Sequence, residues 1–137
     1  MGMKNYALIS ALSFAFLVSC QQKQEPKEAK AVTALTKPIV LSGKKIHYDY
    51  GDSQYEVTVK NDTLLRWESL SGTSKGTTGE ERYYRQDIAP GIIFISWIEK
   101  DGLGVSQVVN WNTHVVNSYL RIKNEIIPIS GTVTEVQ

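Results

Sequence analysis

Residues 90–100 read PGIIFISWIEK and are followed by Asp101-Gly102. The run is rich in β-branched and aromatic residues and is bounded by Pro-Gly and Asp-Gly, which favour turns. Because successive side chains of a strand point to opposite faces, its residues divide into two sets. One face carries Ile93, Ile95, Trp97 and Glu99, and the other carries Ile92, Phe94, Ser96 and Ile98. The stretch therefore predicts a β-strand with a turn at each end.

Similar runs recur on both sides of this strand, separated by Gly, Asn and Asp. No amphipathic helical stripe of ten or more residues appears, so we expect an all-β fold. The predicted strands span residues 44–50, 54–60, 63–70, 80–88, 91–100, 104–112, 114–123 and 125–136. Eight strands in sequence order favour a small up-and-down antiparallel barrel, which can fill its interior or hold one small ligand. A β-sandwich is the competing architecture.

Alternation also identifies the side chains that should face the barrel interior. Tyr48 and Tyr50 point together, and Gln107 aligns with the apolar residues of its strand. With Trp97 and Glu99 they would line an apolar cavity with a few polar groups, as a small-ligand site requires. The alternatives are that the tyrosines belong to a packed core and that Glu99 is a solvated strand end. If Glu99 is buried, its raised pKa suits an acid or base.

Composition excludes several classes of function. The chain has 137 residues with 15 Lys+Arg and 14 Asp+Glu, so it lacks the basic field of a nucleic-acid binder. Its single cysteine allows no internal disulfide and no cysteine-based zinc cluster. His47 and His114 have no partner at metal-ligand spacing, and the Gly-rich loop 71–79 lacks the order of a phosphate-binding loop. We therefore expect no metal, no cofactor and no nucleic-acid partner.

The N-terminal residues 1–19 have the pattern of a signal peptide. Lys4 is followed by an apolar run over residues 6–18, too short for a permanent membrane span. Leu17-Val18-Ser19-Cys20 resembles the bacterial lipobox, which implies cleavage before Cys20 and lipid modification of that residue. An ordinary secretory peptide with a chance cysteine is the alternative. Lipidation at Cys20 would hold the protein on a membrane surface without a spanning segment.

Residues 20–42 are expected to form a flexible tether between the lipid and the domain 43–137. The segment is rich in Gln, Lys, Glu and Ala, with two prolines and no aromatic residue. A short helix over residues 28–35 is the alternative. Gln21, a residue other than Asp after the lipidated cysteine, implies by resemblance to lipoprotein sorting an outer-membrane location in the cell envelope. The sequence does not indicate the leaflet or the oligomeric state.

The stretch from Gly43 to Val109 resembles the calycin-type (lipocalin-like) barrels of the MoaF-like family and, more distantly, bacterial phenolic acid decarboxylases. The matching pieces are His47-Tyr48-Asp49-Tyr50-Gly51, then Tyr55-Glu56-Val57, and the strand that ends Ser96-Trp97-Ile98-Glu99. By this resemblance, Tyr48 and Tyr50 match the tyrosines that hold the substrate carboxylate in the decarboxylases, and Tyr55 matches a third pocket tyrosine. Glu99 matches the carboxylate that acts at the phenol end.

The catalytic arginine of the decarboxylases has no counterpart at the matching position, which is occupied by Thr77 or its neighbour; Lys75 and Arg82 are the nearby cations. A bidentate guanidinium clamp on a carboxylate is therefore missing. Our leading hypothesis is a lipid-anchored barrel that binds a small, aromatic or amphipathic molecule without catalysis. The proposed ligand-binding residues are Tyr48, Tyr50, Tyr55, Trp97 and Glu99.

Two alternatives remain open at this point. The first is a decarboxylase-like acid–base enzyme that acts on small phenolic acids through Glu99 and the tyrosine pair. The second is a structural or interaction lipoprotein whose barrel is filled with side chains. In that case Ile92, Phe94 and Ile98, on the face opposite the expected pocket, would form an exposed docking patch.

Overall fold

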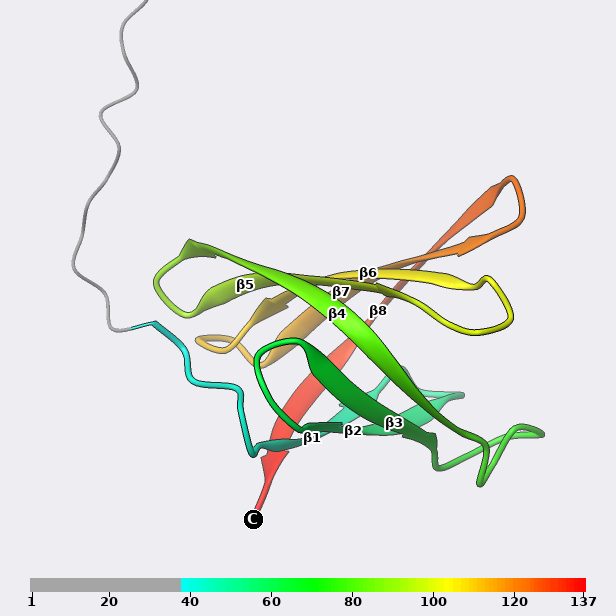
Figure 1. Cartoon of the computed structure of the whole chain (residues 1–137), viewed down its shortest axis with the longest axis horizontal. Coiled ribbons are helices and arrows are strands. Elements are labelled where there is room, and N and C mark those ends of the chain that lie inside the picture. Colours follow the sequence, from blue (N-terminus) through cyan, green and yellow to red (C-terminus); the bar gives the residue numbers. More distant parts are fainter. Residues whose placement is uncertain (1–37) are drawn as a thin grey trace, which may run out of the picture. The chain divides into compact units, whose positions relative to one another are not determined.

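The computed structural model describes residues 38–137 and confirms an all-β fold. Eight antiparallel strands form one closed barrel in sequence order, with β8 paired to β1, so the sandwich alternative is wrong (Figure 1). The strands are β1 (Lys45–Asp49), β2 (Gln54–Val59), β3 (Leu64–Ser69), β4 (Thr78–Ala89), β5 (Ile92–Ile98), β6 (Gly104–Asn110), β7 (Val115–Ile122) and β8 (Glu125–Val136). The predicted signal peptide, Cys20 and the tether up to residue 37 lie outside the described residues.

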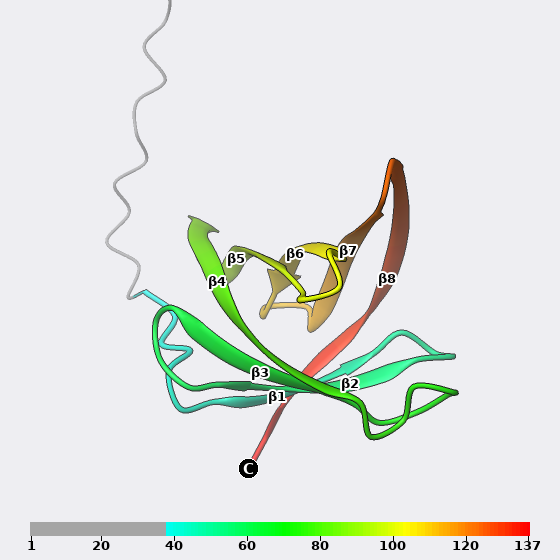
Figure 2. The ribbon, with the colours of Figure 1, turned by 45° about the vertical axis from the view of Figure 1, so that its right-hand side comes forward.

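Two long strands close the barrel. β4 and β8 have 12 residues each, and both run from the layer formed by β1–β3 to the layer formed by β5–β7 (Figures 1 and 2). The register of β4 against β5 shifts between Asp87 and Ala89, which is a β-bulge that bends the strand near its turn into β5. Within residues 38–137 no helix is long and apolar enough to cross a membrane.

The seam between β1 and β8 depends on Gly131. A Cβ atom at this position would lie 2.2 Å from the backbone oxygen of Asp49 and 2.8 Å from the ring of Tyr50. Glycine has no Cβ, so it allows the two strands to approach closely beside the predicted site. The closure of the barrel and the placement of Tyr50 therefore depend on the same residue.

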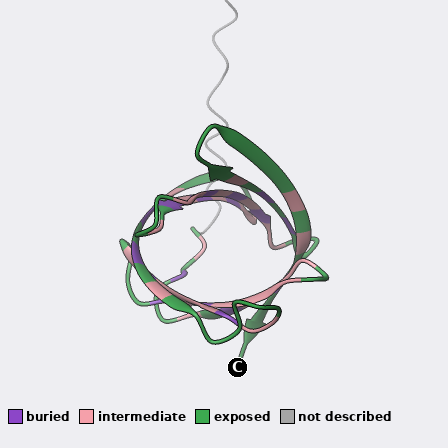
Figure 3. Cartoon of the chain, turned by 90° about the vertical axis from the view of Figure 1, so that its right-hand side faces the viewer, coloured by how far each residue is buried: buried purple, intermediate pink, exposed green. Residues whose placement is uncertain are grey.

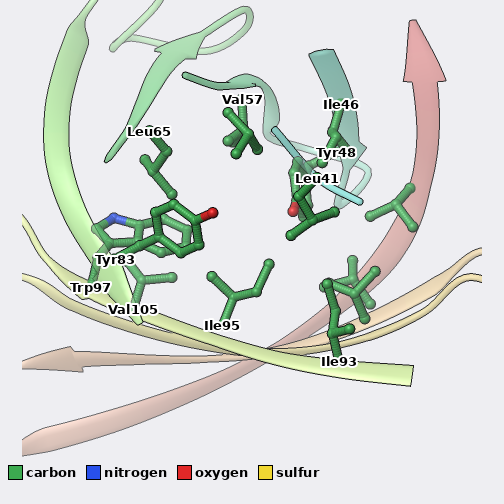
Figure 4. Close-up of a cluster of buried hydrophobic side chains, with 14 residues drawn as sticks. Leu41, Ile46, Tyr48, Val57, Leu65, Tyr83, Ile93, Ile95, Trp97 and Val105 are labelled. Carbon is green, nitrogen blue, oxygen red and sulfur yellow. The ribbon is translucent and has the colours of Figure 1, made fainter. Parts of the chain in front are cut away.

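One end of the barrel is filled by a tightly packed apolar core. Its buried side chains come from strands all round the barrel and include Ile46, Leu65 and Ile93 (Figure 4). Leu41 is also fully buried here, although we expected residues 39–42 to belong to the tether. Arg85 Nη1 donates to the backbone oxygen of Ile39 at 2.8 Å and fixes this segment against β4. The packed domain thus begins before the expected boundary at Gly43.

The tip of the β7–β8 hairpin extends beyond the ring of the barrel and is exposed (Figures 1 and 3). Its apolar residues Ile122, Ile126 and Ile127 are at least 39% exposed. On β5, the outward residue Ile98 is exposed, whereas Ile92 and Phe94 are partly buried. The outward apolar residues of β5 are thus interrupted by Ser96, which bonds to Ser106 of β6, and do not form a continuous patch along this strand.

Candidate functional site

The end of the barrel opposite Leu41 contains an open cavity of about 350 Å³. This volume is within the range of small-molecule sites in proteins. All five predicted ligand-binding residues line it, namely Tyr48, Tyr50, Tyr55, Trp97 and Glu99. The other lining residues are the hydroxyl residues Ser53, Ser69, Ser74 and Thr77, the apolar residues Val57, Trp67, Leu103, Val105, Leu120 and Ile129, and the polar residues Asp101 and Gln107.

Three tyrosines form one wall of the cavity. The rings of Tyr48 and Tyr50 stack with centroids 6.4 Å apart, and the ring of Tyr55 meets Tyr50 edge-on at 6.3 Å. Tyr48 of β1 lies directly opposite Tyr55 of β2, so Tyr50, two residues further along the chain, is diagonal to Tyr55 and within reach of its ring. The tyrosines predicted from the sequence are therefore brought together, and their ring edges and faces present an aromatic surface to the cavity.

The Tyr50 hydroxyl is held by two protein partners. It lies 2.7 Å from Ser118 Oγ of β7 and accepts a hydrogen bond from Gln107 Nε2 of β6 at 2.9 Å. Burial raises the pKa of Tyr50 to about 12, despite these two bonds, which lower it. Burial also raises the pKa of Tyr48 well above its ordinary value. Both hydroxyls therefore stay protonated at neutral pH and can take part in hydrogen bonds only as neutral groups.

Glu99 lies at the rim of the cavity, just beyond the end of β5. Trp97 Nε1 donates to Glu99 Oε1 at 3.4 Å, a contact between residues two apart on the same face of the strand. The pKa of the Glu99 carboxyl is raised to about 7, chiefly by burial; the bond from Trp97 lowers it, and the nearby carboxylates of Asp101 and Glu81 raise it. Glu99 is therefore not a fully solvated strand end: it changes its charge near neutral pH.

Trp67 and Glu81 were among the side chains at or near the cavity that were not predicted from the sequence. Trp67 lines the cavity from β3, and its indole lies against Gly79, where a Cβ atom would come within 2.6 Å of the ring. Glu81 is only 8% exposed and lies two residues along β4 from Tyr83, which pairs with Trp97. Alternation with Leu65 and Tyr83 marks both as inward-facing, a signal already present in the sequence.

The charged groups that line the cavity are all acidic. Lys75 and Arg82 are the two cations near the position of the decarboxylase arginine. Lys75 is exposed in the β3–β4 loop, and Arg82 is exposed on β4. Neither lines the cavity. The tyrosine wall therefore has no neighbouring guanidinium that could complete a bidentate grip on a carboxylate. In the described part of the chain, no three His, Cys, Asp or Glu side chains are grouped to hold a metal ion.

Comparison with known proteins identifies relatives of this barrel. The sequence profile of the MoaF-like family matches residues 42–134. A crystal structure from Burkholderia vietnamiensis, described as a candidate beta-lactamase, superposes with a TM-score of 0.68 at 20% sequence identity. The match covers 74% of this chain and 100% of that one, and it shows a shared fold. No curated protein sequence matches the chain.

Proposed function

The chain belongs to the MoaF-like family, and we propose that its barrel binds a small aromatic or amphipathic molecule without catalysing a reaction. The observation that carries this proposal is the cavity of about 350 Å³, lined by Tyr48, Tyr50, Tyr55, Trp97 and Glu99. A pocket that combines aromatic walls with a few polar groups suits such a ligand, since the walls bury its apolar body and the polar groups orient it.

The roles of the side chains follow from their surroundings. Trp97 and Tyr55 offer ring surfaces against which an aromatic ligand stacks. Glu99 accepts a hydrogen bond from a hydroxyl or amine at the rim. The Tyr50 hydroxyl, which Ser118 and Gln107 hold, orients the neighbouring side chains.

Tryptophan fluorescence provides the test, because Trp67 and Trp97 line the cavity and Trp111 does not. A library of small aromatic compounds is screened by thermal shift and by fluorescence quenching. We expect hits whose quenching persists in Trp111→Phe and is reduced in Trp97→Phe. If no compound in the library shifts the melting temperature or quenches the fluorescence of the wild type, the proposal is refuted.

We further propose that the protein is a lipoprotein of the bacterial cell envelope, anchored at the outer membrane through lipid on Cys20. The support is the lipobox-like Leu17-Val18-Ser19-Cys20 at the end of an apolar run. Buried acyl chains hold a protein on a bilayer without a spanning segment. Metabolic labelling with a fatty-acid probe should label the wild type and leave Cys20→Ala unlabelled. Equal absence of label from both would exclude the anchor.

A decarboxylase-like enzyme that acts on small phenolic acids is the second candidate. The observation in its favour is Glu99, whose pKa of about 7 suits a general acid or base near neutral pH. The absence of Lys and Arg from the described lining residues speaks against it, since the substrate carboxylate would meet no cation. Release of carbon dioxide from hydroxycinnamates by the wild type, lost in Glu99→Gln, would establish this activity.

We do not extend beta-lactamase activity to this chain. Ser69 and Ser74 line the cavity, but their hydroxyls bond to each other at 2.9 Å, and no Lys or His is among the described lining residues to take a proton from either. An activated serine needs an adjacent base. The serine pair is better explained as support for the β3–β4 loop, since Ser69 Oγ also donates to the backbone oxygen of Ser71 at 3.2 Å.

A further inference from the structure

The rim of the cavity carries negative charge with no cationic partner. Glu99 and Asp101 line the cavity, and Glu81 lies close enough to influence the carboxyl of Glu99. None of these three residues takes part in an ion pair within residues 38–137. Lys100, between Glu99 and Asp101, and Arg82, next to Glu81, are exposed, and neither lines the cavity. Among the described residues, an anion that enters the cavity therefore meets only like charge, whereas a cation meets two carboxylates.

A second observation comes from the inner wall of the same cavity. Gln107 is 4% exposed and lines the cavity from β6. Its Nε2 donates to the Tyr50 hydroxyl, but its Oε1 has no hydrogen-bond partner in the described part of the chain. Buried amide oxygens are almost always paired, so an orphaned one beside a cavity indicates a donor supplied from outside the chain.

The two polar features are separated by an apolar surface. Gln107 pairs with Ile95 of β5, four residues before Glu99, which corresponds to roughly 13 Å along the strand at 3.3 Å per residue. Trp97 and Val105, which form a cross-strand pair, line the cavity between them. A matching ligand thus has a polar group at each end and an apolar body in the middle.

We propose that the ligand is an amphipathic amine, with its ammonium group at Glu99 and Asp101 and a hydroxyl or N–H donor that reaches Gln107 Oε1. This inference rests on the proposed ligand-binding function and specifies its ligand class. The apolar body of the amine packs against Trp97 and Val105. The pKa of Glu99, which burial raises, agrees with this arrangement, since an ammonium group beside the carboxyl would favour its ionised form. Free carboxylates of the same size are rejected.

The test uses compounds that share a 4-hydroxyphenyl ring and a two-carbon chain. Tyramine is a cation, tyrosol is neutral and 3-(4-hydroxyphenyl)propanoate is an anion, and calorimetric titration at pH 7.5 compares their affinities. We expect tyramine to bind at least tenfold more tightly than the propanoate, with tyrosol between them. Glu99→Gln should weaken tyramine about tenfold and tyrosol much less, because only tyramine loses a charge partner, and a cooperative thermal transition checks that the variant is folded. Glu125→Gln, at an exposed position of β8, is the matched control and should bind like the wild type.

The donor at the inner end is tested separately by comparing tyramine with phenethylamine, which lacks the hydroxyl. We expect the hydroxyl to improve binding several-fold in the wild type and to give no gain in Gln107→Met. Binding of the propanoate as tightly as tyramine would overturn the amine inference and leave ligand binding intact. Silence of all four compounds would count against both the amine inference and the proposed function.

Discussion

The carboxyl of Glu99 should make the stability of the barrel depend on pH. Its pKa rises from 4.5 to about 7 in the folded protein, chiefly through burial. Between pH 4.5 and about pH 7, the carboxyl therefore keeps its proton in the folded state but has lost it in the unfolded state. Stability falls wherever the folded state binds more protons than the unfolded state. The free energy of unfolding should therefore decrease as pH rises from about 4.5 to about 7 and stay level above that.

The magnitude follows from the size of the pKa change. Each unit of pKa change corresponds to about 1.36 kcal/mol, so the rise from 4.5 to about 7 limits the loss of unfolding free energy to roughly 3 kcal/mol. The carboxyl lies at the rim and is only about half buried, so solvent screening leaves about 1–2 kcal/mol. For a domain of about 100 residues this corresponds to a change of roughly 5–10 °C in Tm.

Thermal and urea denaturation from pH 4.5 to 8.5 measure this effect. Glu99→Gln keeps the shape of the side chain and an oxygen for the Trp97 indole but cannot ionise, so this variant should be more stable than the wild type at pH 8 and equal to it at pH 4.5. Because other groups titrate in the same range, the difference between the two proteins is the informative quantity. Glu125→Gln, at an exposed position, should follow the wild type throughout. Parallel pH profiles of Glu99→Gln and the wild type would refute the assignment of a raised pKa to Glu99.

Three further substitutions test the packing around the cavity and at the filled end. Leu41→Ala should lower the free energy of unfolding by about 2–4 kcal/mol in urea titrations, because it empties a fully buried site, whereas the adjacent exposed Val40→Ala should change it little. Tyr50→Phe should cost about 1–3 kcal/mol, since it leaves a buried amide without its acceptor, and the exposed Tyr84→Phe serves as its control. Gly131→Ala should cost at least about 2 kcal/mol, because its methyl group overlaps the backbone of β1; a stable variant in the same titration would disprove the close approach.

Alternation along single strands was enough to predict part of the cavity wall. Ile93, Ile95 and Trp97 are buried as their shared face predicts, and Glu99, next on that face, lines the cavity. This works because the period of a strand is two, so one correct residue fixes the orientation of every other residue on it. Alternation also grouped Tyr48 with Tyr50, whereas Tyr55, which pairs with Tyr48 across the two strands, was predicted only from the resemblance to the decarboxylases.

Properties that depend on several strands could not be predicted in the same way. The hydroxyl of Tyr50 bonds to Ser118, 68 residues away, and this contact exists only because the barrel closes between β8 and β1. The charge environment of Glu99 includes Glu81, whose position relative to Glu99 depends on the register of β4 against β5. Leu41 was missed because it lies in a segment without strand alternation and is buried by the arrangement of the whole barrel end.

The contrast between the two ends of the barrel explains why a cavity persists. At the filled end the inward positions carry branched aliphatic side chains, and at the other end they carry small hydroxyl residues such as Ser69 and Ser118 between large aromatic ones. Large rings opposite small residues cannot collapse onto each other without leaving their rotamers, so space remains between them. The filled end supplies the stability that allows a half-buried, unpaired carboxyl at the rim. If one end of the barrel provides stability and the other provides the cavity, larger apolar residues in place of the small hydroxyl residues that line the cavity should have two effects. They should raise the free energy of unfolding, and they should abolish ligand binding.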